Sequence, residues 1–488
     1  MALYIGLDIG TTTLSTVILD AESGHLLARH TVLHAAGAST PEEKARGRAE
    51  LDLCKLCGLV TQALADIASR IAARSREIRG IGVTGQMHGV AFLQSDTTPV
   101  RTAITWEDRR ADERLPGSHE TYLERFISLA GGPDAFARTG CLPATGYLGP
   151  TLFWLWQKGL LPSPPARACF IPDAVVSFLT GLPPCTDPTD GGSSGIFDIV
   201  ARGWDWSLIA RLGLPREIFP EVRETGAQAG SLLPALARQT GLPQGIPVFV
   251  ALGDNQASFL GSVREPARGL ALTVGTGSQV SALVERFQRL PGLDTRYFPG
   301  GRYLLVGAGL FGGRSYAYLR DFFRRVGASF FGGRGDEELY DEMTRLAAEV
   351  PLGAEGLRCS PIFTGTRLDP TVRASFAGLA PHNFTPGHLT RALLEGMAEG
   401  FYRFYEEMQP LAGERTHLVG SGNGLRRNRL LAEIVRQRFG LPLYFPALEE
   451  EAATGAALTA AVGTGELANW DAAASLLRYG EPLPARTP

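Results

Sequence analysis

The first strand expected in this chain constrains the fold most, because it carries a carboxylate among apolar residues. The stretch from Leu3 to Thr13 reads LYIGLDIGTTT, and largely β-favouring residues surround Asp8. A carboxylate inside a buried strand is costly unless it is paired or holds a metal. Gly10 then lets the backbone approach a bulky ligand. For so short a pattern, an ordinary edge hairpin with a polar turn is the alternative interpretation.

The turn that follows this strand has the groups that bind a phosphate. It contains Thr11, Thr12 and Thr13, whose N–H and O–H groups can surround a phosphate. Asp8 precedes the turn by two residues, where it could hold a hydrated Mg²⁺ that faces the phosphate. The sequence therefore predicts a phosphate and magnesium site near its start.

Charge and composition restrict the partners of the chain. The net charge of −3 gives no electrostatic footprint for nucleic acid or for an acidic membrane surface. No apolar run is long enough to cross a membrane, and the start of the chain lacks the features of a signal peptide. The six cysteines are scattered, and Cys54 and Cys57 have no second pair that would complete a zinc site. We expect a cytoplasmic protein without nucleic-acid or membrane partners.

Helices alternate with short strands along the chain, which is typical of α/β proteins. A length of 488 residues allows two to four domains. A Pro- and Gly-rich segment ends near Val248, where a new buried strand begins. We therefore expect an N-terminal domain over residues 1–247 and a C-terminal domain over residues 248–488.

A polar loop follows the buried strand expected over residues 78–83. Ligands of open α/β sheets bind beyond the carboxyl ends of strands, and Gln86 and His88 lie at such an end between glycines. Gln86 offers a donor and an acceptor, and His88 can donate to a hydroxyl. A structural histidine with its hydrogen bonds satisfied inside the protein is the alternative for His88.

The segment after this loop has the residue types that recognise a sugar. Trp106 offers a flat apolar face, and the carboxylate of Asp108 accepts hydrogen bonds from hydroxyls. A core tryptophan beside a surface ion pair would give the same pattern.

A carboxylate directly follows the buried strand that opens the second half. Asp254 could take a proton from a substrate hydroxyl while the oxygen attacks phosphorus, and Asn255 could hydrogen-bond the same hydroxyl. Aspartate is also a favoured residue at a helix N-cap, and the two roles are compatible.

The second half repeats the strand, Gly-Thr turn and strand of the opening. ALTVGTGSQVSALV resembles LYIGLDIGTTTLSTVIL without its aspartate, which indicates an internal duplication of the fold. Two such turns could hold one polyphosphate from both sides. Gly312 and Gly313 would let the backbone approach a flat ligand. The glycine-rich loop at 420–424 precedes a helix and suits a nucleotide base or phosphate.

Together these motifs resemble the FGGY carbohydrate kinase family of the ribonuclease-H/actin-like ATPase superfamily. The resemblance extends from about Tyr4 to Val462, and its specificity lies in the order and spacing of the motifs. They read IGLDIGTTT, GIGVTGQMHG, TWEDRR, ALGDNQAS, TVGTGS, FGGRSYAYLRD, VGSGNG and EEAATGAAL. The resemblance implies an α/β fold of two ribonuclease-H/actin-like domains with a catalytic cleft between them.

The resemblance also implies a role for each motif. Asp254 is the catalytic base, and Asp8 holds Mg²⁺ at the phosphates of ATP. The implied phosphate and nucleotide residues are Thr11, Thr12, Thr13, Thr276, Gly277, Gly313, Ser421, Gly422 and Asn423. The implied sugar-binding residues are Gln86, Met87, His88, Trp106, Asp108 and Asn255.

The expected activity is phosphorylation of the terminal hydroxyl of a ketose by ATP, with two domains that close over the substrates. Within the family the motifs look most like those of sedoheptulokinases, although xylulokinases also carry the Gln-Met-His loop. A homodimer is the oligomeric state that we consider for this protein. The competing interpretation is a nucleotide-switched binding protein or sugar sensor, which would share the phosphate turns but would not need a sugar pocket or Asp254.

Overall fold

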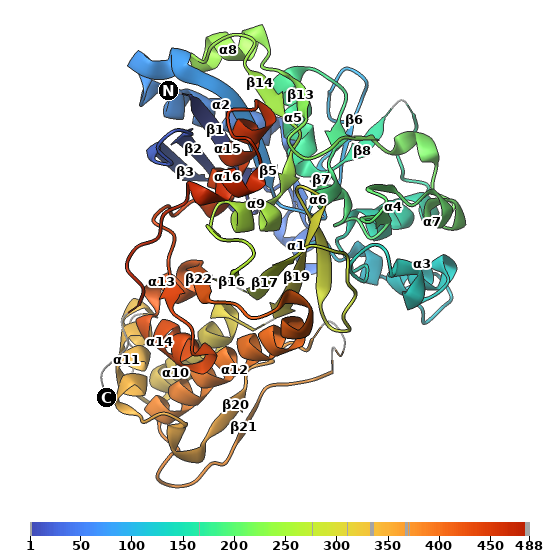
Figure 1. Cartoon of the computed structure of the whole chain (residues 1–488). Coiled ribbons are helices and arrows are strands. Elements are labelled where there is room, and N and C mark those ends of the chain that lie inside the picture. The colour runs from blue at the N-terminus through green and yellow to red at the C-terminus, as the bar shows by residue number, and fades with distance from the viewer. Residues whose placement is uncertain are drawn as a thin grey trace.

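Two mixed β-sheets form the centres of the two parts of the molecule in the computed structural model (Figure 1). The structure describes residues 2–164, 166–275, 277–309, 311–331, 336–366, 369 and 371–483. The two-domain α/β architecture expected for carbohydrate kinases of this type is confirmed.

The first sheet is built around the N-terminal strand. Its order is β13 (Gln228–Ser231), β14 (Pro247–Phe249), β5 (Ile78–Gly85), β1 (Leu3–Ile9), β2 (Thr13–Asp20) and β3 (Leu26–Leu33), and β15 (Leu252–Gly253) also pairs with β5. Strand β1 runs antiparallel to β2 and parallel to β5. The hairpin predicted from the opening residues is therefore a central part of this sheet, with a neighbouring strand on each side.

The second sheet has the same pattern. Its order is β18 (Asp294–Phe298), β19 (Arg302–Gly309), β17 (Ser278–Val284), β16 (Gly269–Val274), β22 (His417–Ser421) and β23 (Leu443–Tyr444). Strand β16 runs antiparallel to β17 and parallel to β22, as β1 does with β2 and β5. The duplication predicted from the sequence is thus present in the strand order.

Helices cover both faces of the first sheet. Helices α2 (Leu53–Ser69) and α5 (Ile171–Thr180) pack in one apolar cluster with alternate residues of β1. Helix α15 (Glu451–Gly463) returns from near the C-terminus and covers the other face, beside α9 (Asp254–Leu260). A Cβ at Gly6 or Gly82 would lie 1.8 Å from a carbonyl oxygen of α15, so glycine is needed at both positions.

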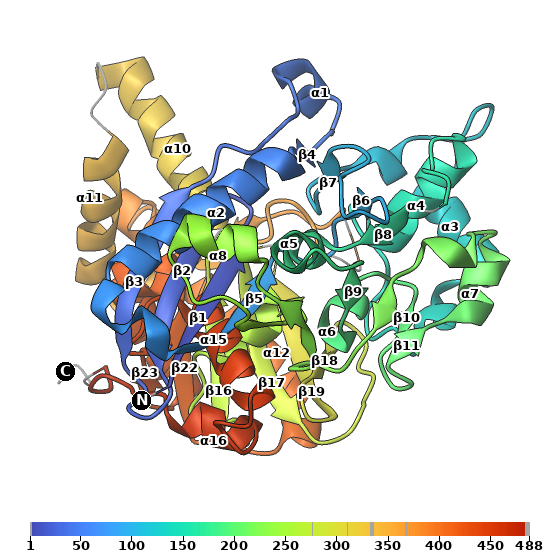
Figure 2. The ribbon, with the colours of Figure 1, turned by 90° about the horizontal axis from the view of Figure 1, so that it is seen from above.

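The second sheet packs against the long helix α12 (Pro386–Ala412), which also contacts α11 (Asp336–Glu349) and α14 (Arg429–Phe439). Helix α10 (Gly313–Phe331) protrudes beside α11 when the molecule is seen from above (Figure 2). The remaining elements are β4 (Glu50–Leu51), β6 (Ala91–Leu93), β7 (Ala103–Ile104), β8 (Arg167–Cys169), β9 (Cys185–Thr186), β10 (Phe197–Asp198), β11 (Gly203–Trp204), β12 (Glu221–Val222), β20 (Arg358–Ser360), β21 (Ser375–Ala377), α1 (Pro41–Ala45), α3 (Tyr122–Ala130), α4 (Leu148–Gln157), α6 (Pro188–Gly191), α7 (Trp206–Arg211), α8 (Pro234–Thr240), α13 (Asn423–Arg427) and α16 (Trp470–Ser475).

The strand pairing places the change from the first sheet to the second later than the boundary expected at residues 247 and 248. Strands β14 and β15 both pair with β5 in the first sheet, and the second sheet begins with β16 at Gly269. The buried strand that opens the second half of the sequence therefore belongs to the first sheet, and this brings Asp254 to the edge where β1 and β5 end.

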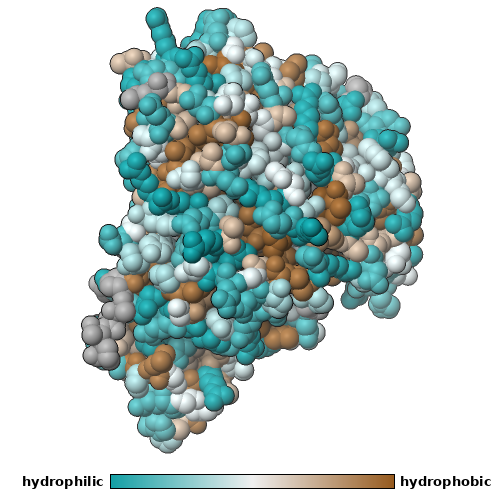
Figure 3. Space-filling view, in the orientation of Figure 1, coloured by the Kyte–Doolittle hydropathy of each residue, from teal (hydrophilic) through white to brown (hydrophobic). Residues whose placement is uncertain are grey.

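Hydrophilic side chains dominate the face seen in Figure 3, with apolar patches near the junction of the upper and lower parts. No helix among the described residues is both long enough and apolar enough to span a membrane.

Candidate active site

The turn between β1 and β2 is held by side chains from outside the hairpin. The Gly10 carbonyl lies 2.9 Å from Nε2 of His34 and accepts from Nε2 of Gln86 at 3.3 Å. Thr12 is exposed, whereas Thr11 and Thr13 are half-buried. The amide nitrogen of Gln86 thus supports the phosphate turn, whereas its buried Oε1 has no hydrogen-bond partner among the described residues, and its predicted sugar contact stays a prediction.

Asp8 lies at the end of β1 among other carboxylates. Burial, together with Asp254 and Glu450, raises its pKa to about 8, and its buried Oδ1 has no hydrogen-bond partner. These carboxylates come from three separate segments, and bringing them together without a cation is unfavourable. Among the described residues, no three histidine, cysteine or carboxylate side chains form a metal cage. Mg²⁺ is usually held by one or two carboxylates with phosphates and waters, so Asp8 fits such a role.

Asp254 is the first residue of α9, directly after β15. Its pKa is raised to about 6 by burial, an effect that Arg296 and the Asn255 backbone N–H partly oppose. A carboxyl of this kind is mostly ionised at neutral pH, yet it is a stronger base than an exposed aspartate. The position and the raised pKa of Asp254 suit proton removal from a hydroxyl.

His88 lies on the loop after β5, and the preceding Met87 approaches α9, since a Cβ at Gly253 would lie 2.6 Å from the Met87 side chain. Its Nδ1 is 2.8 Å from the Ser193 carbonyl, and its ring stacks on Tyr147 at a centroid distance of 4.0 Å. A carbonyl only accepts, so Nδ1 carries the hydrogen and Nε2 of the neutral ring is an acceptor. In the neutral ring, Nε2 would accept a hydrogen bond from a sugar hydroxyl rather than donate one, and the predicted sugar contact of His88 stays a prediction.

A narrow crevice of about 10 Å³ lies next to His88, and it is too small to enclose a sugar. Met87, His88 and residues of β18 line it. The other lining residues were not among the predicted site residues, because they come from distant segments: Cys141, Tyr147, Thr189, Gly192, Ser193, Asp294, Arg296 and Tyr297. Three of them, Thr189, Gly192 and Ser193, share a local signal, since they lie in the turn-rich stretch DPTDGGSSG.

Trp106 and Asp108 have different environments although they are close in sequence. Trp106 is 44% exposed, and its Nε1 donates to Thr11 Oγ1 at 2.9 Å. Asp108 is fully buried, and both its oxygens accept from the Arg110 guanidinium. The Ala49 N–H also donates to it at 2.9 Å. Asp108 is therefore a structural ion-pair partner, which corrects the predicted sugar contact, while the exposed face of Trp106 lies beside the phosphate turn.

Asn255 links the two sheets at the site. Its Nδ2 donates to Gln279 Oε1 at 2.6 Å, and its buried Oδ1 has no partner. Gln279 belongs to β17 of the second sheet, so this bond joins α9 to that sheet. The free acceptor Oδ1 of Asn255 could receive a hydroxyl hydrogen.

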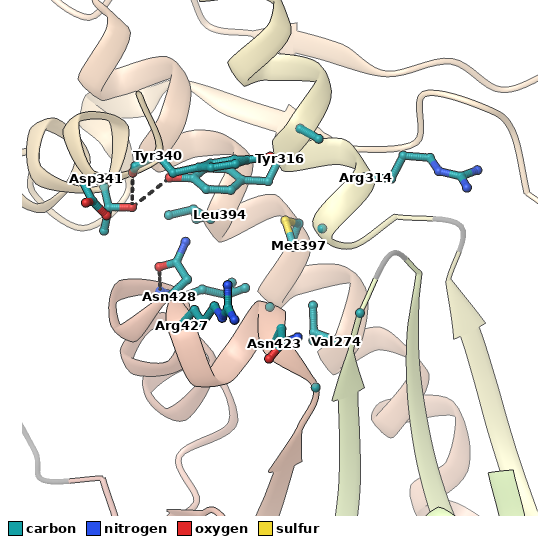
Figure 4. Close-up of a pocket in the computed structure, with 17 residues that line it drawn as sticks. Val274, Arg314, Tyr316, Tyr340, Asp341, Leu394, Met397, Asn423, Arg427 and Asn428 are labelled. Atoms are coloured by element: carbon teal, nitrogen blue, oxygen red, sulfur yellow. Dashed lines mark hydrogen bonds between the residues drawn. The ribbon is translucent and has the colours of Figure 1, made fainter. Parts of the chain in front are cut away.

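A cavity of about 1080 Å³ opens between the second sheet and the helices that cover it. Tyr316 and Tyr340 stack at 5.4 Å on one side, Asn423 and Arg427 lie opposite, and Met397 lies between the two sides (Figure 4). We call this space the C-terminal cavity. Its flat aromatic side and its size suit a nucleotide.

Predicted nucleotide residues surround the end of β16 at this cavity. The Gly313 N–H donates to the Gly275 carbonyl at 2.9 Å, and a Cβ at Gly422 would lie 2.5 Å from the Val274 carbonyl. Gly313, Gly422 and Asn423 line the cavity, whereas the hydroxyl of buried Ser421 is 2.8 Å from that of Thr273. Gly277 is exposed on the adjoining turn, and Thr276 lies outside the described residues.

Comparison with known proteins identifies a protein family whose models match nearly the whole chain. The model of the FGGY family of carbohydrate kinases, N-terminal domain, matches residues 3–261, and that of the C-terminal domain matches residues 270–464. Sedoheptulokinase from Mus musculus is 28% identical over 93% of this chain and 96% of its own length. Xylulose kinase from Bacillus subtilis is 25% identical over 95% of this chain and 89% of its own. The crystal structure of xylulose kinase from Rhodospirillum rubrum superposes with a TM-score of 0.85 at 26% identity, over 100% of this chain and 94% of that one.

Proposed function

Because the chain belongs to the FGGY family of carbohydrate kinases, we propose that it transfers a phosphoryl group from ATP to the terminal hydroxyl of a ketose. The observation that carries this proposal is the position of Asp254, a carboxylate with a raised pKa that interacts electrostatically with Asp8 and with Arg296, a residue of the crevice beside His88. A base between an acceptor site and a phosphate turn is the arrangement that this reaction needs.

In the proposed reaction, Asp254 accepts the proton of the sugar hydroxyl as the hydroxyl oxygen bonds to the γ-phosphorus of ATP and the bond to ADP breaks. His88 Nε2 and Asn255 Oδ1 accept hydrogen bonds from sugar hydroxyls, and Trp106 covers an apolar face of the sugar. A positioned base of this kind contributes about 10²–10⁴-fold to the rate.

The donor would lie in the C-terminal cavity with its base near Tyr316 and Tyr340. Its phosphates would then lie toward Gly275 and the turn of Thr11 to Thr13, where backbone N–H groups and hydroxyls can bind them. Mg²⁺, when bound, would offset charge on the phosphates, and Asp8 is the residue that would hold it.

We propose sedoheptulose as the first candidate sugar and xylulose as the alternative. Similarity to the mouse enzyme named sedoheptulokinase supports the first, and similarity to enzymes named xylulose kinase supports the second. Because the crevice beside His88 is too small for any ketose, the sugar would lie across its mouth or widen it. The six cysteines form no disulfide among the described residues, and a reducing cytoplasm is the location that we propose for the reaction.

The test is ADP formation with ATP and Mg²⁺ over sedoheptulose, D-xylulose, D-ribulose, L-ribulose, D-fructose and glycerol. We expect stimulation by a ketose and the highest kcat/KM with sedoheptulose. A preference for xylulose would keep the reaction and change the sugar. ADP formation that no acceptor stimulates would contradict the kinase proposal and favour a nucleotide-switched protein.

A further inference from the structure

The segment of residues 187–193, which we call the bracket loop and which contains the one-turn helix α6, is buried although its sequence is rich in turn-forming residues. Asp187 and Asp190 are fully buried, and Thr189 and Ser193 nearly so. Loops usually run over the surface, because buried backbone groups must find partners. The partners of the bracket loop are two other segments of the candidate active site.

One side of the bracket loop holds the residue before the proposed base. The Gly253 N–H donates to Thr189 Oγ1 at 2.8 Å, and the Thr189 hydroxyl donates to Asp187 Oδ1 at 2.6 Å. Gly253 is the N-cap of α9, which begins at Asp254. The Thr189 hydroxyl, as both acceptor and donor, therefore fixes the backbone from which the Asp254 carboxylate projects.

Asp187 is itself firmly held. Its Oδ1 accepts the backbone N–H groups of Thr189 and Asp190 at 3.0 and 2.9 Å, and its Oδ2 accepts the Thr225 hydroxyl at 2.5 Å. Thr225 and Thr189 thus both donate a hydroxyl to Asp187, but only Thr189 also contacts Gly253. Thr225 therefore provides a matched control for substitutions at Thr189.

The other side of the bracket loop holds the histidine at the crevice. The Ser193 hydroxyl accepts the His88 N–H at 3.1 Å, and the Ser193 carbonyl accepts from Nδ1 of the same residue at 2.8 Å. His88 has a φ of 74°, a left-handed conformation that a histidine adopts only at some cost. Two bonds from one serine therefore hold both the backbone and the ring of His88.

We propose that Thr189 and Ser193 are positioning residues, which fix Asp254 and His88 to one buried loop so that the sugar hydroxyl meets the base in a constant geometry. The inference deepens the proposed kinase function and rests on it. A misplacement of about 1 Å at a reacting group can cost about 10²-fold in rate. Thr189 acts through Gly253 on the base, and Ser193 acts through His88 on the sugar, so their variants should affect different kinetic constants.

The experiment compares Thr189→Val, Thr189→Ser, Thr225→Val and Ser193→Ala with the wild type in the full chain. For Thr189→Val we expect kcat to fall at least tenfold, with sugar affinity by calorimetry within threefold. Thr189→Ser, which keeps the hydroxyl, should restore kcat to within threefold. Thr225→Val removes the other hydroxyl from Asp187 and should leave kcat within threefold. Ser193→Ala should raise the KM for sugar more than it lowers kcat.

Amide hydrogen exchange of the peptide that contains Gly253 measures positioning without turnover. We expect Thr189→Val to speed exchange there and Thr225→Val to leave it unchanged. Equal exchange and equal kcat in these two variants would overturn the inference. If Thr189→Val does not fold, Thr189→Cys, which is close in size and a weak hydrogen-bonding group, replaces it in both measurements.

A wild-type protein that no acceptor stimulates would contradict the proposed function, while the exchange result would still decide the positioning role of Thr189.

Discussion

The two glycine-threonine turns of this protein occupy equivalent places in its two sheets but differ in charge. Strand β1 ends in Asp8-Ile9 and is followed by Gly10, and β16 ends in Thr273-Val274 and is followed by Gly275. Asp8 pairs with Thr84 on the parallel neighbour β5, and Thr273 pairs with Ser421 on the parallel neighbour β22. Asp8 and Thr273 therefore occupy the same position of a duplicated unit.

Their surroundings show how the two units have diverged. The Thr273 hydroxyl is 2.8 Å from the Ser421 hydroxyl, so this position is neutral and hydrogen-bonded within the protein. Asp8 has a buried oxygen without a partner and a pKa raised to about 8 by burial and by two other carboxylates. The same backbone thus supports an acidic turn suited to a cation in one half and a neutral turn beside the nucleotide-sized cavity in the other.

The largest effect is expected from a substitution of Asp254, the proposed base. Asp254→Asn should lower kcat by about 10²–10⁴-fold, because the amide cannot accept the hydroxyl proton. Steady-state kinetics measures the loss, and calorimetry should find the sugar affinity within a few fold of the wild type. Substantial residual turnover would contradict the role of Asp254 as the base.

The difference between the two turns can be tested by replacing Asp8 and Thr273, one at a time, with side chains of similar size that lack the carboxylate or the hydroxyl. Asp8→Asn should raise the Mg²⁺ concentration for half-maximal activity by about 10–100-fold, since loss of a group that holds a metal typically weakens binding by such a factor. Thr273→Val, at the equivalent position, is the matched control and should leave the Mg²⁺ requirement unchanged. Equal Mg²⁺ dependence in the two variants would mean that the halves are not specialised as we infer.

The pH dependence of activity should report the raised pKa of Asp254. Because this carboxyl has a pKa of about 6 and must be ionised to act, kcat/KM should be constant above about pH 7 and fall about tenfold per unit below pH 6. Arg296 lowers this pKa, so Arg296→Met should move the midpoint to higher pH. A profile that stays flat down to pH 5 would exclude Asp254 as the titrating base.

The raised pKa of Asp254 affects the stability of the fold in the opposite direction: activity rises with pH, whereas the contribution of this carboxyl to stability falls. A carboxyl whose pKa is higher in the folded chain than its ordinary 3.8 favours folding while it is protonated. Its contribution is fully present below about pH 4 and is lost as the pH rises through 6. Relative to wild type, Asp254→Asn should therefore unfold at an increasingly higher temperature from pH 4.5 to about 7, as measured by calorimetry, and the difference should then level off. A constant difference in unfolding temperature over this range would contradict the raised pKa.

A smaller effect is expected at the rim of the acidic turn. Trp106→Ala should raise the KM for sugar about tenfold and the KM for ATP less, because the indole face covers the sugar. Trp106→Phe keeps an aromatic face but loses the bond to Thr11, which separates the two roles. Trp156, which is 45% exposed on α4, is the control, and Trp156→Ala should change neither constant. Equal rises in both KM values for Trp106→Ala would count against a sugar contact.

The duplicated hairpins could be predicted because their pattern is local. The apolar strand, the buried Asp8 and the glycine turn are contiguous in the sequence, and the same order recurs at β16. Asp254 was likewise identifiable, as a carboxylate directly after a buried strand. Such features depend on residues within a few positions of one another.

The roles of Asp108 and Gln86 could not be predicted in this way, because tertiary contacts decide them. Asp108 is buried against Arg110 and Ala49, and Gln86 reaches the Gly10 carbonyl in the turn between β1 and β2. The burial of the bracket loop could not be predicted, because its partners Gly253 and His88 are distant in sequence. The pairing of β14 and β15 with the first sheet could not be predicted, because nothing local indicates which sheet a buried strand joins.

The most direct test of the account is a crystal structure with a ketose, a non-hydrolysable ATP analogue and Mg²⁺. We predict that the terminal hydroxyl oxygen of the sugar lies about 2.6–3.2 Å from a carboxylate oxygen of Asp254, with Mg²⁺ on the side of Asp8 and the base in the C-terminal cavity. A sugar bound away from Asp254, or a metal on the side of Thr273, would contradict the specialisation of the two halves.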